Sequence, residues 1–213
     1  MPTSTNRFRQ IRRFATVAGS ALLLCAAMLS GCATTPGLTH SGFLSDYSRL
    51  SAVDRGGMRF QSPNADEYRS FILDPVQVTV SGDVLNPEER AEAARYFFDQ
   101  FERAFVDTGF AVTGEPGVGV ARVRLALTDV AESTWWKKIH PVSRAAGAGT
   151  GGAAMEAEVV DSVTGEQIAA VIQAGKGNQF NLTNFSTLAD VKSAIDGWAR
   201  IAADRLKGLK AGT

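Results

Sequence analysis

The sequence predicts an α+β fold, in which a single domain has a mostly antiparallel sheet and two long amphipathic helices packed on one face. Short runs of alternating apolar and polar residues follow one another along the middle of the chain, as in antiparallel strands with one buried and one wet face. Two longer segments, 87–108 and 186–208, repeat apolar residues every three or four positions, which indicates helices. Strands in series flanked by two such helices are typical of an α+β domain.

The first 31 residues have the three parts of a bacterial export signal. Four arginines and no acidic residue lead into an apolar run from Phe14 to Leu29, and the small residues Ser30 and Gly31 follow it. A helix that spans a membrane needs roughly 20 apolar residues, and this run is shorter. The sequence therefore predicts a cleaved signal peptide over 1–31 rather than a permanent membrane helix.

The segment Leu29-Ser30-Gly31-Cys32 resembles the lipobox of bacterial lipoproteins. In those proteins the chain is cut before the cysteine, and its thiol carries a diacylglycerol as part of an acyl (palmitate-type) membrane anchor. Cys32 is the predicted lipidation site, and no cysteine remains after it. Because Ala33 rather than an acidic residue follows, the resemblance implies an outer-membrane lipoprotein, anchored by its N-terminal lipid and facing the periplasm.

The charge of the mature chain excludes some classes of partner. Without residues 1–31, 22 − 4 = 18 basic side chains face 22 acidic ones. This balance argues against nucleic acid as a partner, because binding it needs a clustered basic face. It also argues against attachment to anionic lipid by charge alone, so the lipid anchor is the expected contact with the membrane.

After the signal peptide we expect a tether over 32–40 and an α+β periplasmic domain over 41–213. Residues 41–74 carry scattered aromatic residues without a sustained period, which predicts an extended N-terminal arm that wraps the domain. The alternating run from Val76 to Val80 is a predicted strand.

The first helix has clear start and stop signals. Asn86 can cap it, Pro87 suits its first turn and Gly109 ends it. One apolar stripe is expected to bury its side chains at Ala94, Phe97, Phe98, Phe101 and Phe105.

Three further strands and the last helix follow. Strands are expected at 120–129, 155–161 and 167–175, the last two joined by a hairpin turn with Gly165. The final helix should begin near Ser186 and end near Lys207 and Gly208. Its buried stripe is expected at Leu188, Val191, Ile195, Trp198, Ala202 and Leu209.

The mature chain resembles a family of bacterial lipoproteins known as domain of unknown function 3313. The string Ser41-Gly42-Phe43-Leu44-Ser45-Asp46-Tyr47-Ser48 carries most of this resemblance. Weaker support comes from Asp74-Pro75-Val76, from 122–129 and from Glu156-Ala157-Glu158-Val159-Val160-Asp161. The resemblance implies an exported lipoprotein with one α+β domain, and it supplies no catalytic residues.

Several patterns suggest chemistry but have a simpler structural interpretation. Glycines at 147–152 match the spacing of a dinucleotide motif, but a strand rather than a helix should follow, so a loop is expected. Glu156 and Glu158 could serve a glycosidase together with Asp129, Glu132 or Asp161. Since the two glutamates alternate along a strand, as Arg122 and Arg124 do on another, we expect cross-strand ion pairs on an exposed face.

No metal, cofactor or catalytic triad is predicted. Only two histidines exist, His40 and His140, and neither has metal-ligand spacing or a G-x-S-x-G serine motif to work with. The expected protein is therefore not an enzyme.

The segment Trp135-Trp136-Lys137-Lys138-Ile139-His140-Pro141 is the candidate contact surface. Two adjacent tryptophans cannot both point inward from a strand, and tryptophan beside lysine suits a protein interface or a membrane surface. The alternative is that one tryptophan covers the core. The candidate partner-binding residues are Trp135, Trp136, Lys137, Lys138 and His140.

Three functions remain open. The leading hypothesis is a non-catalytic accessory module that contacts an envelope protein. The alternative is an auxiliary lipoprotein of a lipid-transport system that binds an apolar ligand, and a cell-wall hydrolase is third. A cavity lined by Phe97, Phe101 or Trp198 would favour the alternative, full packing of these side chains would favour the accessory module, and two carboxylates in a cleft would favour the hydrolase.

Overall fold

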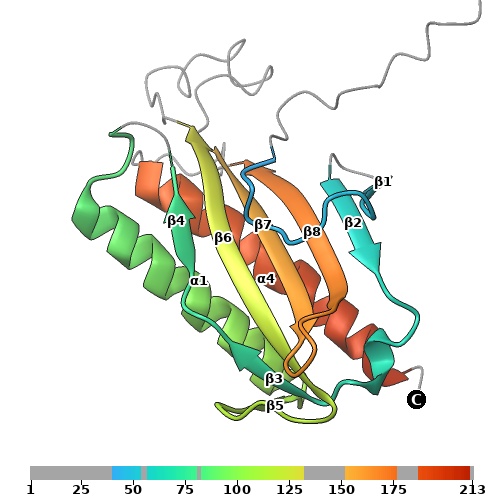
Figure 1. Cartoon of the computed structure of the whole chain (residues 1–213). Coiled ribbons are helices and arrows are strands. Elements are labelled where there is room, and N and C mark those ends of the chain that lie inside the picture. The colour runs from blue at the N-terminus through green and yellow to red at the C-terminus, as the bar shows by residue number, and fades with distance from the viewer. Residues whose placement is uncertain (1–39, 54–56, 81–82, 132–151, 177–186, 212–213) are drawn as a thin grey trace, which may run out of the picture. The chain divides into compact units, whose positions relative to one another are not determined.

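Strands β6, β7 and β8 form the centre of a sheet that has both long helices on one face (Figure 1). The computed structural model describes residues 40–53, 57–80, 83–131, 152–176 and 187–211. Its strands are β1 (Ser51–Val53), β2 (Gly57–Gln61), β3 (Ser70–Leu73), β4 (Gln77–Thr79), β5 (Ala111–Val112), β6 (Val120–Ala131), β7 (Gly152–Asp161) and β8 (Gln167–Lys176). Its helices are α1 (Pro87–Asp107), α4 (Thr187–Ala211) and the short 3₁₀ turn η1 (Ala65–Glu67). The predicted α+β class is confirmed.

The strand order is β1-β2-β8-β7-β6-β3-β5, and β4 also pairs with β6. Along this order, the pairings β1-β2, β2-β8, β8-β7 and β7-β6 are antiparallel, as predicted. By contrast, β3 and β4 both run parallel to β6. The chain passes through α1 between β4 and β6, and such a crossover returns a strand in the same direction. Asp74-Pro75 separates β3 from β4, and proline cannot donate to a strand ladder.

Helix α1 begins and ends where its sequence signals predict. The Asn86 side chain accepts a 2.9 Å hydrogen bond from the Glu89 amide, and the Glu89 carboxylate accepts one of 2.9 Å from the Asn86 amide. This capping box satisfies two free amides of the first turn. Gly109 follows the helix with φ +77°, a conformation that glycine adopts without strain.

The buried stripe of α1 is shifted slightly from the predicted one. Ala94 and Phe98 are only half-buried. The helix instead buries Ala93, Phe97, Phe101, Ala104 and Phe105. In α4, the predicted core residues Val191, Ile195 and Trp198 are buried, but the helix continues to Ala211, beyond the predicted end at Gly208.

Gly175 in β8 allows α4 to approach the sheet closely. A Cβ atom at this position would lie 2.7 Å from the Cβ of Ala194 and 3.0 Å from Cζ2 of Trp198. Both distances are below normal van der Waals contact, so a larger residue would displace the helix. The glycine thus fixes where the Trp198 indole lies against β8.

The predicted arm over 41–74 is too long. Residues 41–50, hereafter the arm, precede the first strand, while β1, β2 and β3 take much of the remainder into the sheet. The aromatic residues that suggested a wrapping segment are divided accordingly. Phe60 lies in β2, and Phe71 lies in β3 and packs in the main core.

Candidate functional site

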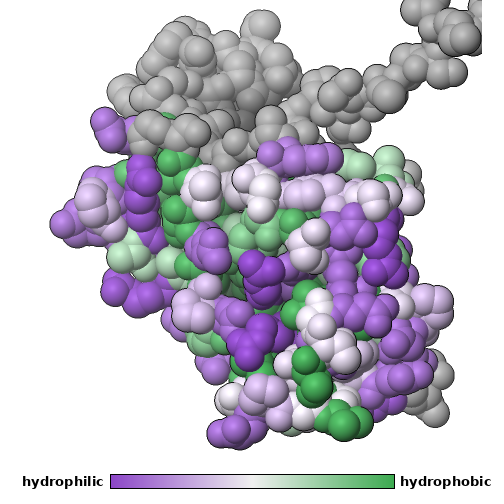
Figure 2. Space-filling view, in the orientation of Figure 1, coloured by the Kyte–Doolittle hydropathy of each residue, from purple (hydrophilic) through white to green (hydrophobic). Residues whose placement is uncertain are grey.

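The arm crosses the face of the sheet that the helices leave uncovered (Figure 1). Beneath it lies a small apolar cluster, formed by Leu44 and Leu50 of the arm with Ala170 and Ile172 of β8. Hydrophilic residues predominate on the outer surface of this side (Figure 2). The arm therefore closes a second, minor core and presents a polar surface outward.

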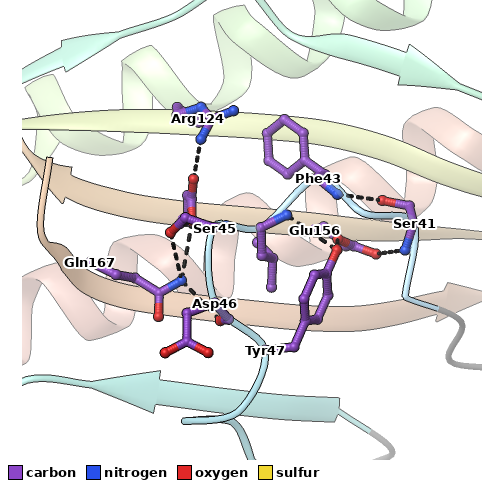
Figure 3. Close-up of polar contacts among 10 residues, drawn as sticks. Ser41, Phe43, Ser45, Asp46, Tyr47, Arg124, Glu156 and Gln167 are labelled. Atoms are coloured by element: carbon purple, nitrogen blue, oxygen red, sulfur yellow. Dashed lines mark hydrogen bonds and ion pairs between the residues drawn. The ribbon is translucent and has the colours of Figure 1, made fainter.

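Glu156 of β7 is fully buried under the arm and is bound by it at both carboxylate oxygens. The Ser41 amide donates a 2.7 Å hydrogen bond to Oε1, and the Tyr47 hydroxyl donates one of 2.5 Å to Oε2 (Figure 3). Burial, followed by this bond to Glu156, raises the pKa of Tyr47. The His40 ring stacks on Tyr47 at a centroid distance of 4.3 Å.

Glu158, two residues along β7, is also fully buried and has four donors. The Ser45 amide and hydroxyl each donate a 2.8 Å hydrogen bond to Oε2, to which Gln167 Nε2 also donates at 3.1 Å. Arg124 of β6, which is directly opposite in the register, forms an ion pair with Oε1. A buried carboxylate is stable only when charge and hydrogen bonds compensate it, and these four groups supply both.

The expected exposure of both glutamates is therefore wrong, and the expected cross-strand ion pair forms at Glu158 with Arg124, whereas Glu156 binds the arm instead. Alternation along a strand fixes which face a side chain takes but not what covers that face. Arg122 matches the original expectation better, since its 2.5 Å ion pair with Asp74 leaves both side chains about a third exposed.

A pocket lies on the opposite side of the sheet, between α4 and strands β2 and β8. Its volume is about 160 Å³ and it is partly open to the surface. Trp198, Ile201, Ala202 and Arg205 line it from one face of α4, and Phe101 and Phe105 from α1. The lining is mostly apolar.

Two arginines belong to the lining of this pocket, Arg59 from β2 and Arg205 from α4. Burial and then the nearby Arg59 charge lower the pKa of Arg205. Tyr68 also lines the pocket, but its hydroxyl donates a 2.9 Å hydrogen bond to Asp161, and burial and this bond raise its pKa to about 12.

The predicted site residues lie outside the described residues. These are the lipidation site Cys32 and the candidate contact residues Trp135, Trp136, Lys137, Lys138 and His140. The glycine-rich segment 147–151 and Glu132 lie outside them too. These interpretations stay predictions.

Within the described ranges, no group of three or more potential metal ligands comes together. The same ranges contain no helix that is long and apolar enough to cross a membrane.

The features so far define a class: an α+β domain whose sheet is sealed by an N-terminal arm on one face and holds an apolar pocket on the other. The chain belongs to the family described as protein of unknown function DUF3313, whose model matches residues 39–202. This confirms the family resemblance seen in the sequence. No curated protein matches the sequence.

Solved structures with a similar arrangement are distant. The PelC dodecamer from Paraburkholderia phytofirmans is 9% identical, with 66% of this chain and 93% of that chain covered and a TM-score of 0.41. A minor lipoprotein from Acinetobacter baumannii is 8% identical, with 67% and 95% covered and a TM-score of 0.38. Lipoprotein GNA1162 from Neisseria meningitidis is 10% identical, with 68% and 99% covered and a TM-score of 0.37. These likenesses are too distant to carry an argument about function.

The sequence singled out Phe97, Phe101 and Trp198 to distinguish a cavity from full packing. Phe101 and Trp198 line the pocket but are only 4% and 2% exposed, and Phe97 packs fully in the core. Sequence reasoning missed Arg59 and Arg205. Arg205 follows Trp198, Ile201 and Ala202 on one apolar face of α4, which is a weak signal. Arg59 shares its face of β2 with Gly57 and Gln61 and gave no such signal.

Proposed function

We propose that this chain is a non-catalytic lipoprotein of the bacterial envelope that binds an apolar ligand between α4 and the sheet. The observation that carries the proposal is the pocket lined by Phe101 and Trp198. A pocket at these residues is expected of an auxiliary lipoprotein in lipid transport and not of an accessory module that only contacts another protein. The pocket therefore favours the lipid-transport auxiliary.

The proposed location rests on the sequence. Cys32 lies at the end of the apolar leader and would carry the lipid, and the absence of an acidic residue after it favours the outer membrane. Ser41, where the arm first binds the sheet, lies 41 − 32 = 9 positions after Cys32, so eight residues intervene. Nine steps from Cα to Cα reach at most about 30 Å, so the domain would stay close to its membrane.

Support for a non-catalytic role comes from the buried carboxylates. Glu156 and Glu158 are the paired acids that a cell-wall hydrolase would need, and in this fold every one of their oxygens is bound beneath the arm. A hydrolase needs such groups in a cleft that admits a glycan. These two are engaged in attaching the arm instead.

The test is binding of a small uncharged apolar probe, 1-octanol, followed by NMR of the full chain in phosphatidylcholine nanodiscs. We expect chemical-shift changes confined to residues that line the pocket. Ala202→Phe should abolish them by filling the space, whereas Ala91→Phe, which adds the same ring at an exposed position of α1, should leave them intact. Octanol binding that survives Ala202→Phe would contradict the proposal.

A further inference from the structure

We propose that the ligand of this pocket is a single-chain anionic lipid, whose head group lies between Arg59 and Arg205 and whose acyl chain enters the apolar interior. The inference rests on the proposed function and adds the chemical class of the ligand.

The two arginines come from opposite walls of the pocket. Arg59 pairs with Val171 in the register of β2 and β8, and Val171 packs against the core on the helix side. Its neighbours Ala170 and Ile172 belong to the cluster under the arm. Because faces alternate along a strand, Arg59 is directed toward α4, the helix that carries Arg205.

The residues that the structure describes offer neither arginine an anionic partner. Among the described residues, no ion pair or hydrogen bond involves the side chain of Arg59 or Arg205, and no acidic side chain lines the pocket. Both side chains are half-buried, and the two charges are close enough for Arg59 to contribute to the lowered pKa of Arg205.

Two like charges that are partly removed from water favour a counter-ion between them. A guanidinium binds carboxylate or phosphate oxygens through paired hydrogen bonds, which makes it well suited to an anionic head group. A neutral apolar ligand would fill the pocket but would leave both charges uncompensated. Charge complementarity therefore favours an anionic amphiphile over a neutral one.

The volume limits the apolar part of the ligand. The pocket holds about 160 Å³, close to an engineered cavity of about 150 Å³ that accepts benzene, a molecule with six carbons. It is smaller than the roughly 300–1,000 Å³ of sites that enclose drug-sized ligands. The enclosed volume thus accommodates about six carbons of one acyl chain.

The experiment compares three probes with the same chain and different head groups: octanoate, 1-octanol and octyltrimethylammonium. Binding to the full chain in phosphatidylcholine nanodiscs is measured by NMR titration. Octanoate should bind at least tenfold more tightly than octanol, and octyltrimethylammonium more weakly than either. Affinity for the carboxylates from butanoate to octanoate should rise about fourfold for each buried methylene and then level off.

Variants at the arginines test the head-group contact itself. Arg59→Gln and Arg205→Gln should each remove most of the preference for octanoate while octanol still binds, and Arg59→Lys and Arg205→Lys should keep part of it. Arg95→Gln, on an exposed part of α1 away from the pocket, is the matched control and should change nothing. The three-probe comparison on the unmodified protein measures the head-group preference by itself, so the test holds even if a variant fails to fold.

The outcomes separate the two proposals. If octanoate and octanol bind equally and the arginine variants have no effect, the head-group inference is overturned while the apolar pocket stands. If none of the three probes binds, the proposed function fails as well.

Discussion

Tyr47 and Glu156 lie 109 residues apart in the sequence, and the hydroxyl of the first donates a 2.5 Å hydrogen bond to the buried carboxylate of the second. The bond joins the arm to the central strand β7. Together with the Ser41 amide it satisfies a charge that would otherwise be buried alone. The arm is thus a part of the domain's polar interior rather than a loose extension.

Replacing Tyr47 by phenylalanine should lower the free energy of unfolding by about 1–3 kcal/mol, the usual cost of removing a hydrogen bond to a buried charged group. Urea denaturation measures this loss. Ser48→Ala is the control, because the hydrogen bond from the exposed Ser48 hydroxyl to Asp46 is open to solvent, and it should change stability little. Equal effects of the two substitutions would show that the arm adds no more than a surface contact.

The two ion pairs that β6 forms, Arg124 with Glu158 and Arg122 with Asp74, should contribute differently to the free energy of unfolding. Glu158→Gln should destabilise the fold by about 3 kcal/mol, since it breaks a pair in which the acid is fully buried. Asp74→Asn should cost no more than about 1 kcal/mol, because both partners of that pair are about a third exposed. Chemical denaturation of both variants provides the comparison, and a larger loss for Asp74→Asn would refute the assignment.

The fold should lose stability in strong base. All three tyrosines have a raised pKa, and burial together with hydrogen bonds to acids raises those of Tyr68 and Tyr96 to about 12. The folded state therefore holds protons that the unfolded chain releases near pH 10. The stabilisation is complete below about pH 10 and is lost as the pH rises toward about 12. Unfolding followed by tyrosinate absorbance tests this, and Tyr68→Phe should remove part of the loss.

The proposed lipid anchor predicts the behaviour of a single substitution just after the leader. Cys32→Ser should give an unprocessed precursor without lipid, because the hydroxyl cannot form the thioether. Fatty-acid labelling and mass spectrometry of the N-terminus provide the measurement. Cys25→Ser is the matched control and should be labelled normally, whereas labelled Cys32→Ser protein would remove the anchor from the proposal.

The tryptophan segment gives a separate prediction about partners. Trp135→Ala combined with Trp136→Ala should leave the melting temperature unchanged and reduce crosslinking to envelope proteins. Lys137→Ala with Lys138→Ala tests whether the neighbouring charges contribute. An unchanged set of crosslinked proteins in both double variants would exclude the segment as a contact surface.

Local signals predicted helix α1 well. Asn86, Glu89 and Gly109 act within a few residues of where they stand, so capping chemistry and periodicity were sufficient. The hairpin of β7 and β8 was equally accessible, because its turn lies between two alternating runs. The parallel pairing of β3 and β4 with β6 depends on a crossover through α1, and no local pattern encodes it.

The polar interior was beyond the reach of the pattern alone. Glu156 and Glu158 have the alternation of solvent-facing residues, and only contact with a segment more than 100 residues away makes them buried. Helix periodicity placed Phe101 and Trp198 on the sheet side of their helices, which is the side where the pocket lies. That Arg59 and Arg205 line the same pocket follows from the register of β2 against β8, and the sequence alone does not specify that register.

The hydrogen bond from Ser41 to Glu156 sets a limit on how this protein can be shortened into a soluble form. A chain that begins at Ser51, the first residue of β1, would lack the hydrogen-bond donors that the arm supplies to Glu156 and Glu158. It would also expose Ala170 and Ile172, which the arm covers. Such a fragment should aggregate or fail to fold. Trimming has to stop before His40, which stacks on Tyr47, so the removable linker ends only a few residues after the predicted lipidation site, Cys32.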